Sequence, residues 1–210
     1  MRQIKIAAII VLSLTALLLS IQLASVLLLE GAGPGGKGPN CTLARESSIP
    51  ADDICSLEID YHMNSNEVFF YQGEGQEILV REYLNFTPKE SQLSTLQQKD
   101  SLLLIKGTKR NFFSFPLFNF GSSSGYGYTE IYLPTGLMEN LEDLSVKTLS
   151  GDVQSDIVLE QKGSFSVSTT SGDLRFPEVE AAQIHASTVS GSIWLDQARA
   201  ETFQVSTTSG

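Results

Sequence analysis

Four copies of one short pattern decide the fold of this chain: LSVKTLSGDV (144–153), FSVSTTSGDL (165–174), IHASTVSGSI (184–193) and FQVSTTSG (203–210). The Ser-Gly serines stand at 150, 171, 190 and 209, so successive copies are 21, 19 and 19 residues apart. A threonine precedes every one of these serines by two positions. The repeated positions are the turn pairs Ser150-Gly151, Ser171-Gly172, Ser190-Gly191 and Ser209-Gly210, and the threonines Thr148, Thr169, Thr188 and Thr207.

Each copy predicts a half-buried β-strand that bends at its glycine. Apolar side chains stand four and six residues before each serine, and polar ones lie between them. This period of two is typical of a strand with one buried face. After Ser-Gly the apolar positions shift by one residue, which we attribute to a bend. Glycine adopts left-handed or otherwise strained backbone conformations at little steric cost, so the Ser-Gly pairs are predicted to be structural turns.

A repeat of about 20 residues that cannot bury its own apolar face is typical of a solenoid. We therefore predict a parallel β-helix or β-solenoid with rungs of 19–21 residues, in which the four threonines form an inward ladder. Upstream, further period-two segments are found at 57–61, 68–71, 78–83, 102–106 and 130–133, each bounded by turn-forming residues. The predicted fold class is all-β.

The repeats VKTLSGDVQ, SVSTTSGDLRF and HASTVSGSIWL, which follow the strand TEIYLP (129–134), resemble the bacterial DUF4097 family of "putative adhesins". The resemblance extends over residues 53–210. It implies a parallel β-helix-like fold and a cell-envelope setting, and it transfers no catalytic residue to this chain. Similar membrane-anchored proteins occur among envelope-stress-response components, which implies a second possible role by analogy only.

The amino-terminal segment predicts a membrane anchor. Residues 6–29 carry no charge, and as a helix they would span about 36 Å, enough for a bilayer core of about 30 Å. Arg2 and Lys5 precede this segment and Glu30 follows it, which places the amino terminus in the cytoplasm. A cleaved signal peptide is the alternative.

The predicted organisation is therefore a cytoplasmic stub (1–5), a transmembrane helix (6–29), a spacer rich in Gly and Pro (30–52) and an extracytoplasmic domain (53–210). The domain ends at Gly210 directly after its last Ser-Gly, whereas the earlier copies continue into a further strand. From this we expect the carboxyl end to be truncated.

The charge balance argues against nucleic acid as a partner. The chain has 14 basic and 24 acidic residues, a formal net charge of −10. A surface that binds nucleic acid needs clustered Lys and Arg to displace condensed counterions, and the basic residues here are scattered.

Two cysteines, Cys41 and Cys55, fall in the exported part. A disulfide between them would close a loop of about 14 residues and contribute roughly 3 kcal/mol, and two free thiols are the alternative. The two histidines, His62 and His185, are not spaced with the cysteines as Zn²⁺ ligands usually are, so no metal or cofactor is predicted.

Catalysis is not predicted. Asp152, Asp156 and Asp173 could form a carboxylate cluster, but Asp152 and Asp173 follow the turn glycine, where Asp is favoured for backbone hydrogen bonding. No base can be paired with a serine nucleophile, since His185 is expected on the outward face of its strand.

The predicted binding surface is an aromatic run. Its residues are Phe112, Phe113, Phe115, Phe118, Phe120, Tyr126 and Tyr128. Aromatic side chains bind sugars and partner proteins, although the phenylalanines could instead plug the amino-terminal end of the solenoid.

The leading hypothesis is a membrane-anchored, non-enzymatic surface protein that contacts cell-wall or matrix glycan, or another surface or membrane protein. The alternatives are an accessory component of an envelope stress response, and a polysaccharide-active enzyme.

Overall fold

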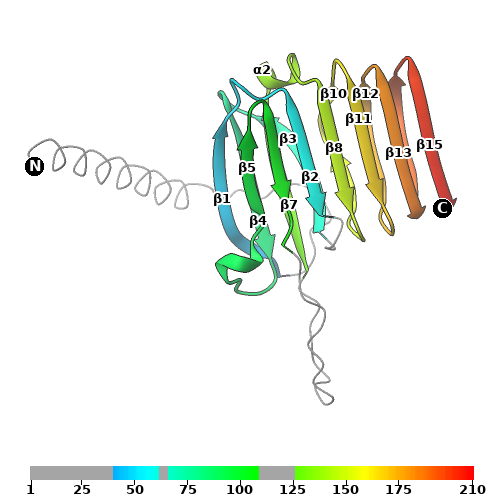
Figure 1. Ribbon diagram of the computed structural model, residues 1–210. Helices are drawn as coiled ribbons and strands as arrows, with labels where there is room; N and C mark the ends of the chain where they lie inside the picture. Colours follow the sequence, from blue (N-terminus) through cyan, green and yellow to red (C-terminus); the bar gives the residue numbers. More distant parts are fainter. Residues whose placement is uncertain (1–39, 62–65, 109–125) are drawn as a thin grey trace, which may run out of the picture. The chain divides into compact units, whose positions relative to one another are not determined.

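The computed structural model describes residues 40–61, 66–108 and 126–210, and strands dominate these ranges (Figure 1). The all-β prediction is confirmed. Helical structure in the described residues is confined to a 3₁₀ turn at Glu90–Gln92 and to α2 (Thr135–Met138). None of the described helices is long and apolar enough to cross a membrane, and the predicted anchor at 6–29 lies outside the described residues.

The strands form two sheets. Sheet A contains, in spatial order, β1 (Thr42–Pro50), β4 (Glu77–Leu84), β7 (Gly127–Pro134), β3 (Asn66–Gly73), the short strands β9 (Val153–Ser155) and β10 (Leu159–Glu160), then β12 (Leu174–Glu180) and β14 (Ile193–Arg199). Sheet B contains β15 (Thr202–Ser209), β13 (Gln183–Ser190), β11 (Ser164–Thr169), β8 (Asp143–Thr148), β2 (Ser56–Tyr61), β6 (Leu102–Lys106) and β5 (Thr95–Lys99).

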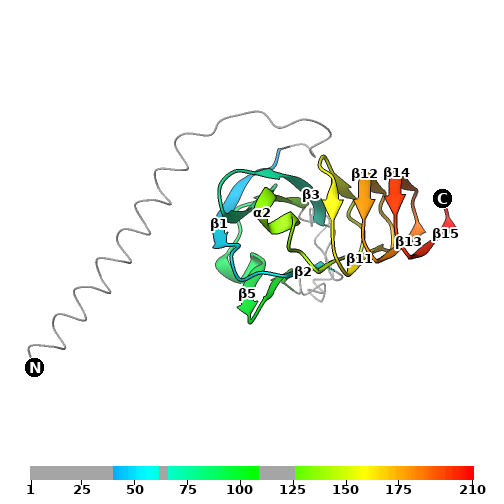
Figure 2. The same cartoon turned by 90° about the horizontal axis from the view of Figure 1, so that it is seen from above.

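The repeats stack in parallel and in register. In sheet B, Phe165 pairs with Leu144 on one side and with Ile184 on the other, and Ile184 pairs with Phe203. In sheet A, Leu174 pairs with Ile193. Figure 2 shows β12 and β14 side by side on one face of the stack and β11, β13 and β15 on the other. The chain thus alternates between the sheets, and equivalent positions form columns.

The stack extends beyond the repeats recognised in the sequence. Strand β2 pairs in parallel with β8, and β3 pairs in parallel with β9, so β2 and β3 form a rung of their own. On their other side, β6 and β7 pair in parallel with β2 and β3. At that end of the stack the parallel arrangement stops. There β4 pairs antiparallel with β7 and with β1, and β5 pairs antiparallel with β6.

One core fills the space between the sheets. The largest fully buried apolar side chains come from both sheets and from the connections: Tyr61, Phe70, Phe165, Phe176, Ile54, Leu57, Ile59, Ile78, Leu103, Ile105, Ile131 and Leu133. The rings of Phe165 and Phe176 meet edge to face across the core, with centroids 5.0 Å apart. Apolar burial is the main stabilising contribution here, at about 25 cal/mol per Å².

The predicted spacer at 30–52 is wrong over its second half, because Thr42–Pro50 forms β1 and pairs with β4. This strand lacks clear apolar alternation, since it lies at the edge of sheet A and most of its side chains are only half-buried. Edge strands carry a weak sequence signal for this reason.

The turn glycines serve close packing. Their backbone is not left-handed, since Gly75 is the glycine with positive φ among the described residues. A Cβ on Gly172 would overlap the carbonyl oxygen of Gly151. In the same way, a Cβ on Gly191 would overlap the carbonyl oxygen of Gly172, and one on Gly210 that of Gly191. Glycine is therefore required because one rung's backbone lies directly on the next.

The repeated threonines hydrogen bond to these glycine carbonyls. Thr148, Thr169 and Thr188 are buried, and Thr207 is exposed on the last strand. Thr188 Oγ1 donates to Gly172 O at 3.1 Å, and Thr207 Oγ1 donates to Gly191 O at 3.0 Å. The Ser150, Ser171 and Ser190 side chains lie on the exposed side of the same turn.

Candidate functional site

An aromatic cluster covers the outer face of sheet A where β3, β4 and β7 lie side by side. Alternation along the strands produces it: Val68 and Phe70 of β3 point into the core, so Phe69 and Tyr71 point out. The same holds for Tyr83 and Arg81 of β4, and for Tyr128, Glu130 and Tyr132 of β7. We call Phe69, Tyr71, Tyr83, Tyr128 and Tyr132 the aromatic cluster.

The rings of the cluster form a continuous arc of contacts. Tyr83 stacks on Tyr128 with centroids 4.5 Å apart, and Tyr128 meets Phe69 edge to face at 5.9 Å. Phe69 stacks with Tyr71 at 6.5 Å, and Tyr71 meets Tyr132 at 5.2 Å. The Arg81 guanidinium lies 5.1 Å from the Tyr132 ring centroid and continues the arc.

Glu130 lies at the centre of this arc. It pairs with Phe69 on one neighbouring strand and with Arg81 on the other, and its side chain is buried, with the residue only 1% exposed. Tyr132 Oη donates a hydrogen bond to Glu130 Oε2 at 3.0 Å. Arg81 Nε donates to Glu46 Oε2 at 2.7 Å, so its main ionic partner is on β1.

The surroundings keep the tyrosine hydroxyls protonated. Burial raises the pKa of Tyr71, Tyr83, Tyr128 and Tyr132 above the usual value, and the charge of Glu130 raises the pKa of each further. Neutral hydroxyls can donate to the carboxylate, whereas phenolates would repel it. The cluster is therefore built around a carboxylate and protonated phenols.

This arrangement predicts a loss of stability in alkali. The folded chain holds the tyrosine protons more tightly than the unfolded chain does, so their stabilising contribution is complete below about pH 10 and is lost as the pH rises through the folded pKa values. Denaturant unfolding at pH 8, 10 and 11 should show a falling free energy of unfolding. The double variant Tyr71→Phe/Tyr83→Phe should show a smaller fall, and an unchanged slope would contradict the assignment.

The aromatic surface predicted from the sequence coincides with the cluster at one residue. Phe112, Phe113, Phe115, Phe118 and Phe120 lie outside the described residues. Tyr126 is half-buried, and Tyr128 is buried within the cluster. The remaining members were missed, although their alternate spacing in β3 and β7 was a usable signal.

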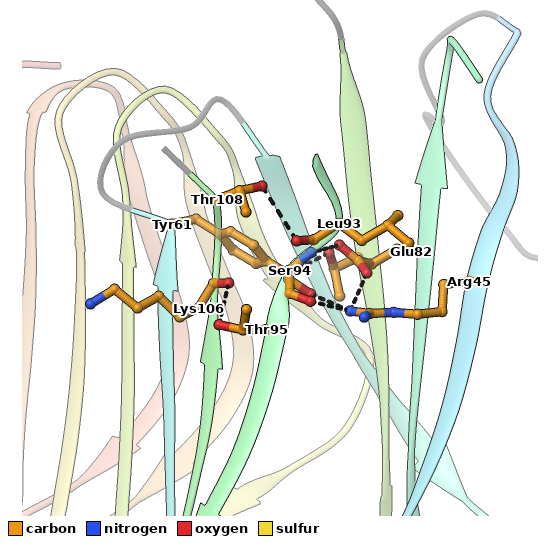
Figure 3. A network of polar contacts seen from close by, with 9 residues as sticks. Arg45, Tyr61, Glu82, Leu93, Ser94, Thr95, Lys106 and Thr108 are labelled. Atoms are coloured by element: carbon orange, nitrogen blue, oxygen red, sulfur yellow. Dashed lines mark hydrogen bonds and ion pairs between the residues drawn. The ribbon is translucent and has the colours of Figure 1, made fainter. Parts of the chain in front are cut away.

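A second polar network lies inside the domain and links the two sheets (Figure 3). Arg45 Nη2 donates to Glu82 Oε2 at 2.5 Å and to Ser94 O at 2.6 Å, and Ser94 N donates to Glu82 Oε1 at 3.0 Å. Glu82 and Ser94 are buried. Nearby, Tyr61 Oη and Thr129 Oγ1 are 2.9 Å apart. These contacts join β1 and β4 of sheet A to the start of β5 in sheet B, which is a structural role.

The disulfide considered from the sequence is not formed. Cys41 and Cys55 are both free thiols. Cys41 directly precedes β1 and Cys55 directly precedes β2, so the nine residues of β1, about 30 Å long, lie between them in the chain, whereas a disulfide needs Cα atoms less than about 7 Å apart.

The aspartates of the repeats have structural hydrogen bonds. Asp152 Oδ1 accepts from Asp173 N at 2.8 Å, and Asp173 Oδ1 accepts from Ser192 N at 2.9 Å, so each carboxylate binds the next rung's backbone. His185 is half-buried and pairs with Ser166 of β11 and Gln204 of β15, and His62 lies outside the described residues. Across the described ranges, no three His, Cys, Asp or Glu side chains gather to hold a metal ion.

These features define the class: an all-β protein made of stacked repeats, with an aromatic cluster on the outer face of one sheet. A comparison with family models then gives the family. The chain belongs to the DUF4097 family, described as Toastrack DUF4097, whose model matches residues 54–210. The resemblance drawn from the repeats is confirmed.

Several solved structures are similar to this chain. A "putative adhesin" from Parabacteroides distasonis ATCC 8503 is 14% identical with a TM-score of 0.39, over 78% of this chain and 69% of that one. A "putative cell adhesion protein" from Clostridium sporogenes ATCC 15579 is 8% identical with a TM-score of 0.44, over 78% and 99%. A "putative adhesin" from Parabacteroides merdae ATCC 43184 is 15% identical with a TM-score of 0.41, over 78% and 68%. No curated protein matches the chain.

Proposed function

We propose that this protein is a non-catalytic surface-interaction protein, anchored in the cell membrane by residues 6–29, with its β domain outside the cell. We also propose that the repeat part is a β-solenoid, which would hold the binding face rigid. The aromatic cluster is the observation that carries the proposal. Tyr and Arg side chains on a rigid support are the residues that contribute most to protein recognition.

The sheet supports a binding role because it fixes the cluster in place. The strands that carry the cluster are each paired on both sides, β7 by β4 and β3, and β3 by β7 and β9. A surface that is already ordered loses little side-chain entropy when a partner binds.

The proposal that the protein is not an enzyme rests on the hydrogen bonds of the carboxylates that were considered for catalysis. Asp152 and Asp173, the carboxylates considered for glycan cleavage, accept backbone amides from the next rung. Their hydrogen bonds stabilise the stack, and this role explains their position beside the turn glycines.

Sedimentation with isolated cell envelopes tests the proposal. The purified full chain should co-sediment saturably with envelopes and release no soluble sugar. The double variant Tyr71→Ala/Tyr132→Ala should sediment at least about tenfold less well, as expected for loss of two interface anchors. The matched control Ser166→Ala/Gln204→Ala, on the outer face of sheet B, should behave as the parent does. Release of sugar, or equal binding by both variants, would overturn the proposal.

A further inference from the structure

We infer that Gln154, Arg175 and Trp194 form a binding row for a neutral glycan chain on the outer face of sheet A. The three residues occupy equivalent positions of successive rungs, on β9, β12 and β14. The inference adds a second contact site to the aromatic cluster, and the proposed function does not depend on it.

The binding row follows from the register of the stack. Gln154 pairs with Arg175, and Arg175 pairs with Trp194. Each of the three lies between two residues that pack in the core, as Leu174 and Phe176 do on either side of Arg175. Because side chains alternate along a strand, all three point outward. Neighbouring strands are about 4.8 Å apart, so the row is about 10 Å long.

Trp194 gives the row an accessible aromatic surface. It is the single tryptophan of the chain, and it is 39% exposed. The stack does not require an aromatic residue at this position, because the two preceding rungs have Gln154 and Arg175 there. A large ring that remains in contact with water stabilises the fold little, and Trp is enriched where proteins bind partners.

The Arg175 guanidinium is held beside this ring and keeps its hydrogen-bonding groups available. Its Cζ lies 4.6 Å from the Trp194 ring centroid, within the range of cation–π attraction. Among the side chains that the structure describes, no carboxylate pairs with Arg175, whereas Arg199 on β14 bonds to both Glu178 and Glu180. The N–H donors of Arg175 therefore face solvent next to the exposed indole.

The chemistry of the row matches a sugar chain. A sugar ring presents C–H groups on its face and hydroxyls at its edge, and each hydroxyl both donates and accepts hydrogen bonds. The indole offers a flat apolar surface to the ring face. The Arg175 guanidinium donates to hydroxyls, and the Gln154 amide donates and accepts.

A protein partner fits this row less well. Anchor residues in protein interfaces are surrounded by contacts that exclude water. Trp194 is instead bordered by Arg175 and by Asp196, which is exposed on the same face of β14. Polar groups around one aromatic ring suit the hydroxyls around a sugar ring.

The charges near the row favour a neutral glycan over an acidic one. Asp196 is exposed on β14, Asp156 is exposed directly after β9, and Asp152 and Asp173 directly precede β9 and β12. Four carboxylates therefore lie on or next to the strands that carry one guanidinium, that of Arg175. The chain as a whole has a formal charge of −10. Such a field repels polyanionic chains.

The row also leads to the aromatic cluster. Gln154 pairs on its other side with Phe69 of β3, whose ring meets Tyr71 and Tyr128. A linear glycan that lies across the strands along the row thus approaches the cluster at its Phe69 end.

Fluorescence of Trp194 tests the inference on the full chain, because the emission of a single tryptophan reports on this site alone. The chain is kept in micelles of a polyoxyethylene detergent, which carries no sugar. Linear hexasaccharides of glucose and of N-acetylglucosamine are the neutral probes, and at least one of them should shift the emission saturably to shorter wavelength. A hexasaccharide of galacturonic acid, with a carboxylate on every ring, should leave the emission unchanged.

Two variants with the same change in net charge isolate the role of Arg175. Arg175→Ala should weaken binding of the neutral hexasaccharide by about fivefold, the scale of a lost hydrogen bond. Lys147→Ala, which removes an exposed cation from the outer face of sheet B, should bind as the parent does.

Titration calorimetry extends the test to variants that lack the indole. Trp194→Ala should bind the hexasaccharide at least about tenfold more weakly, as expected for loss of an anchor residue. Trp194→Phe keeps a smaller ring and should recover part of the loss. Circular dichroism shows that each variant is folded, and Arg175→Ala carries the test for any variant that is not.

Each result decides the inference. No emission change with either neutral probe overturns it, as does an equal response to the galacturonic acid probe or equal weakening in Lys147→Ala. If the neutral probes do not bind while envelopes still sediment with the parent and fail to do so with Tyr71→Ala/Tyr132→Ala, the glycan inference falls and the proposed function stands. Binding of a neutral probe at Trp194 without envelope binding leaves the inference standing and overturns the proposed function.

Discussion

Gly172→Ala is expected to lower the free energy of unfolding by about 3 kcal/mol or more, an effect at or above the upper end for overpacked sites. The added Cβ would overlap the carbonyl oxygen and carbon of Gly151 in the preceding rung. These are backbone atoms between β8 and β9, which pair in parallel with β11 and β12, so no side chain can rotate away to make room. The rungs would have to separate, which breaks the Thr169 hydrogen bond to the Gly151 carbonyl as well. Urea unfolding followed by circular dichroism measures the change.

Gly136→Ala is the matched control, because a Cβ at Gly136 meets no atom within 4 Å. This glycine lies in α2, where alanine reduces the entropy of the unfolded chain and should leave stability unchanged or raise it by about 0.4–1 kcal/mol. If both substitutions are tolerated equally well, close stacking is not the reason for the repeated glycine.

The repeats were predictable because their equivalent residues are nearly identical. Residues Leu144, Phe165, Ile184 and Phe203 share one column in the sequence and pair in register in sheet B. The rung made by β2 and β3 was not predicted as part of the stack. In its register Tyr61 stands opposite Thr148, and the backbone of Asn66 lies against Gly151, so the Thr-x-Ser-Gly pattern is absent from it. Pairing continues there through backbone geometry without the sequence signature.

The candidate site could not be predicted from the sequence, because it depends on which strands are neighbours in the sheet. Phe69, Arg81 and Glu130 are adjacent only because β7 inserts between β3 and β4, in parallel with one and antiparallel to the other. Alternation tells which side chains point outward, and it does not tell which strands are neighbours. The sequence therefore marked Tyr128 as part of a binding surface while it missed the carboxylate at the centre.

Arg45→Ala is expected to lower the free energy of unfolding by about 3–5 kcal/mol, the usual cost of leaving a buried charge without its partner. Glu82 is 3% exposed and receives hydrogen bonds from Arg45 Nη2 and Ser94 N. Arg45 also donates to Ser94 O, so its loss leaves a buried carbonyl without this donor and detaches β1 from the start of β5. Denaturant unfolding of the single variant measures the effect.

A double variant separates the penalty of an isolated charge from the value of the pair. Arg45→Met with Glu82→Leu removes both charges and keeps similar volume, so stability should recover most of the loss. Lys147→Ala breaks an exposed pair, in which Nζ lies 3.7 Å from Glu58 Oε1, and should cost less than about 1 kcal/mol. A loss in Arg45→Ala no greater than in Lys147→Ala would show that water reaches Glu82 and hydrates it. The large difference expected between the two follows from burial, because the charges and the hydrogen-bonding groups are otherwise alike.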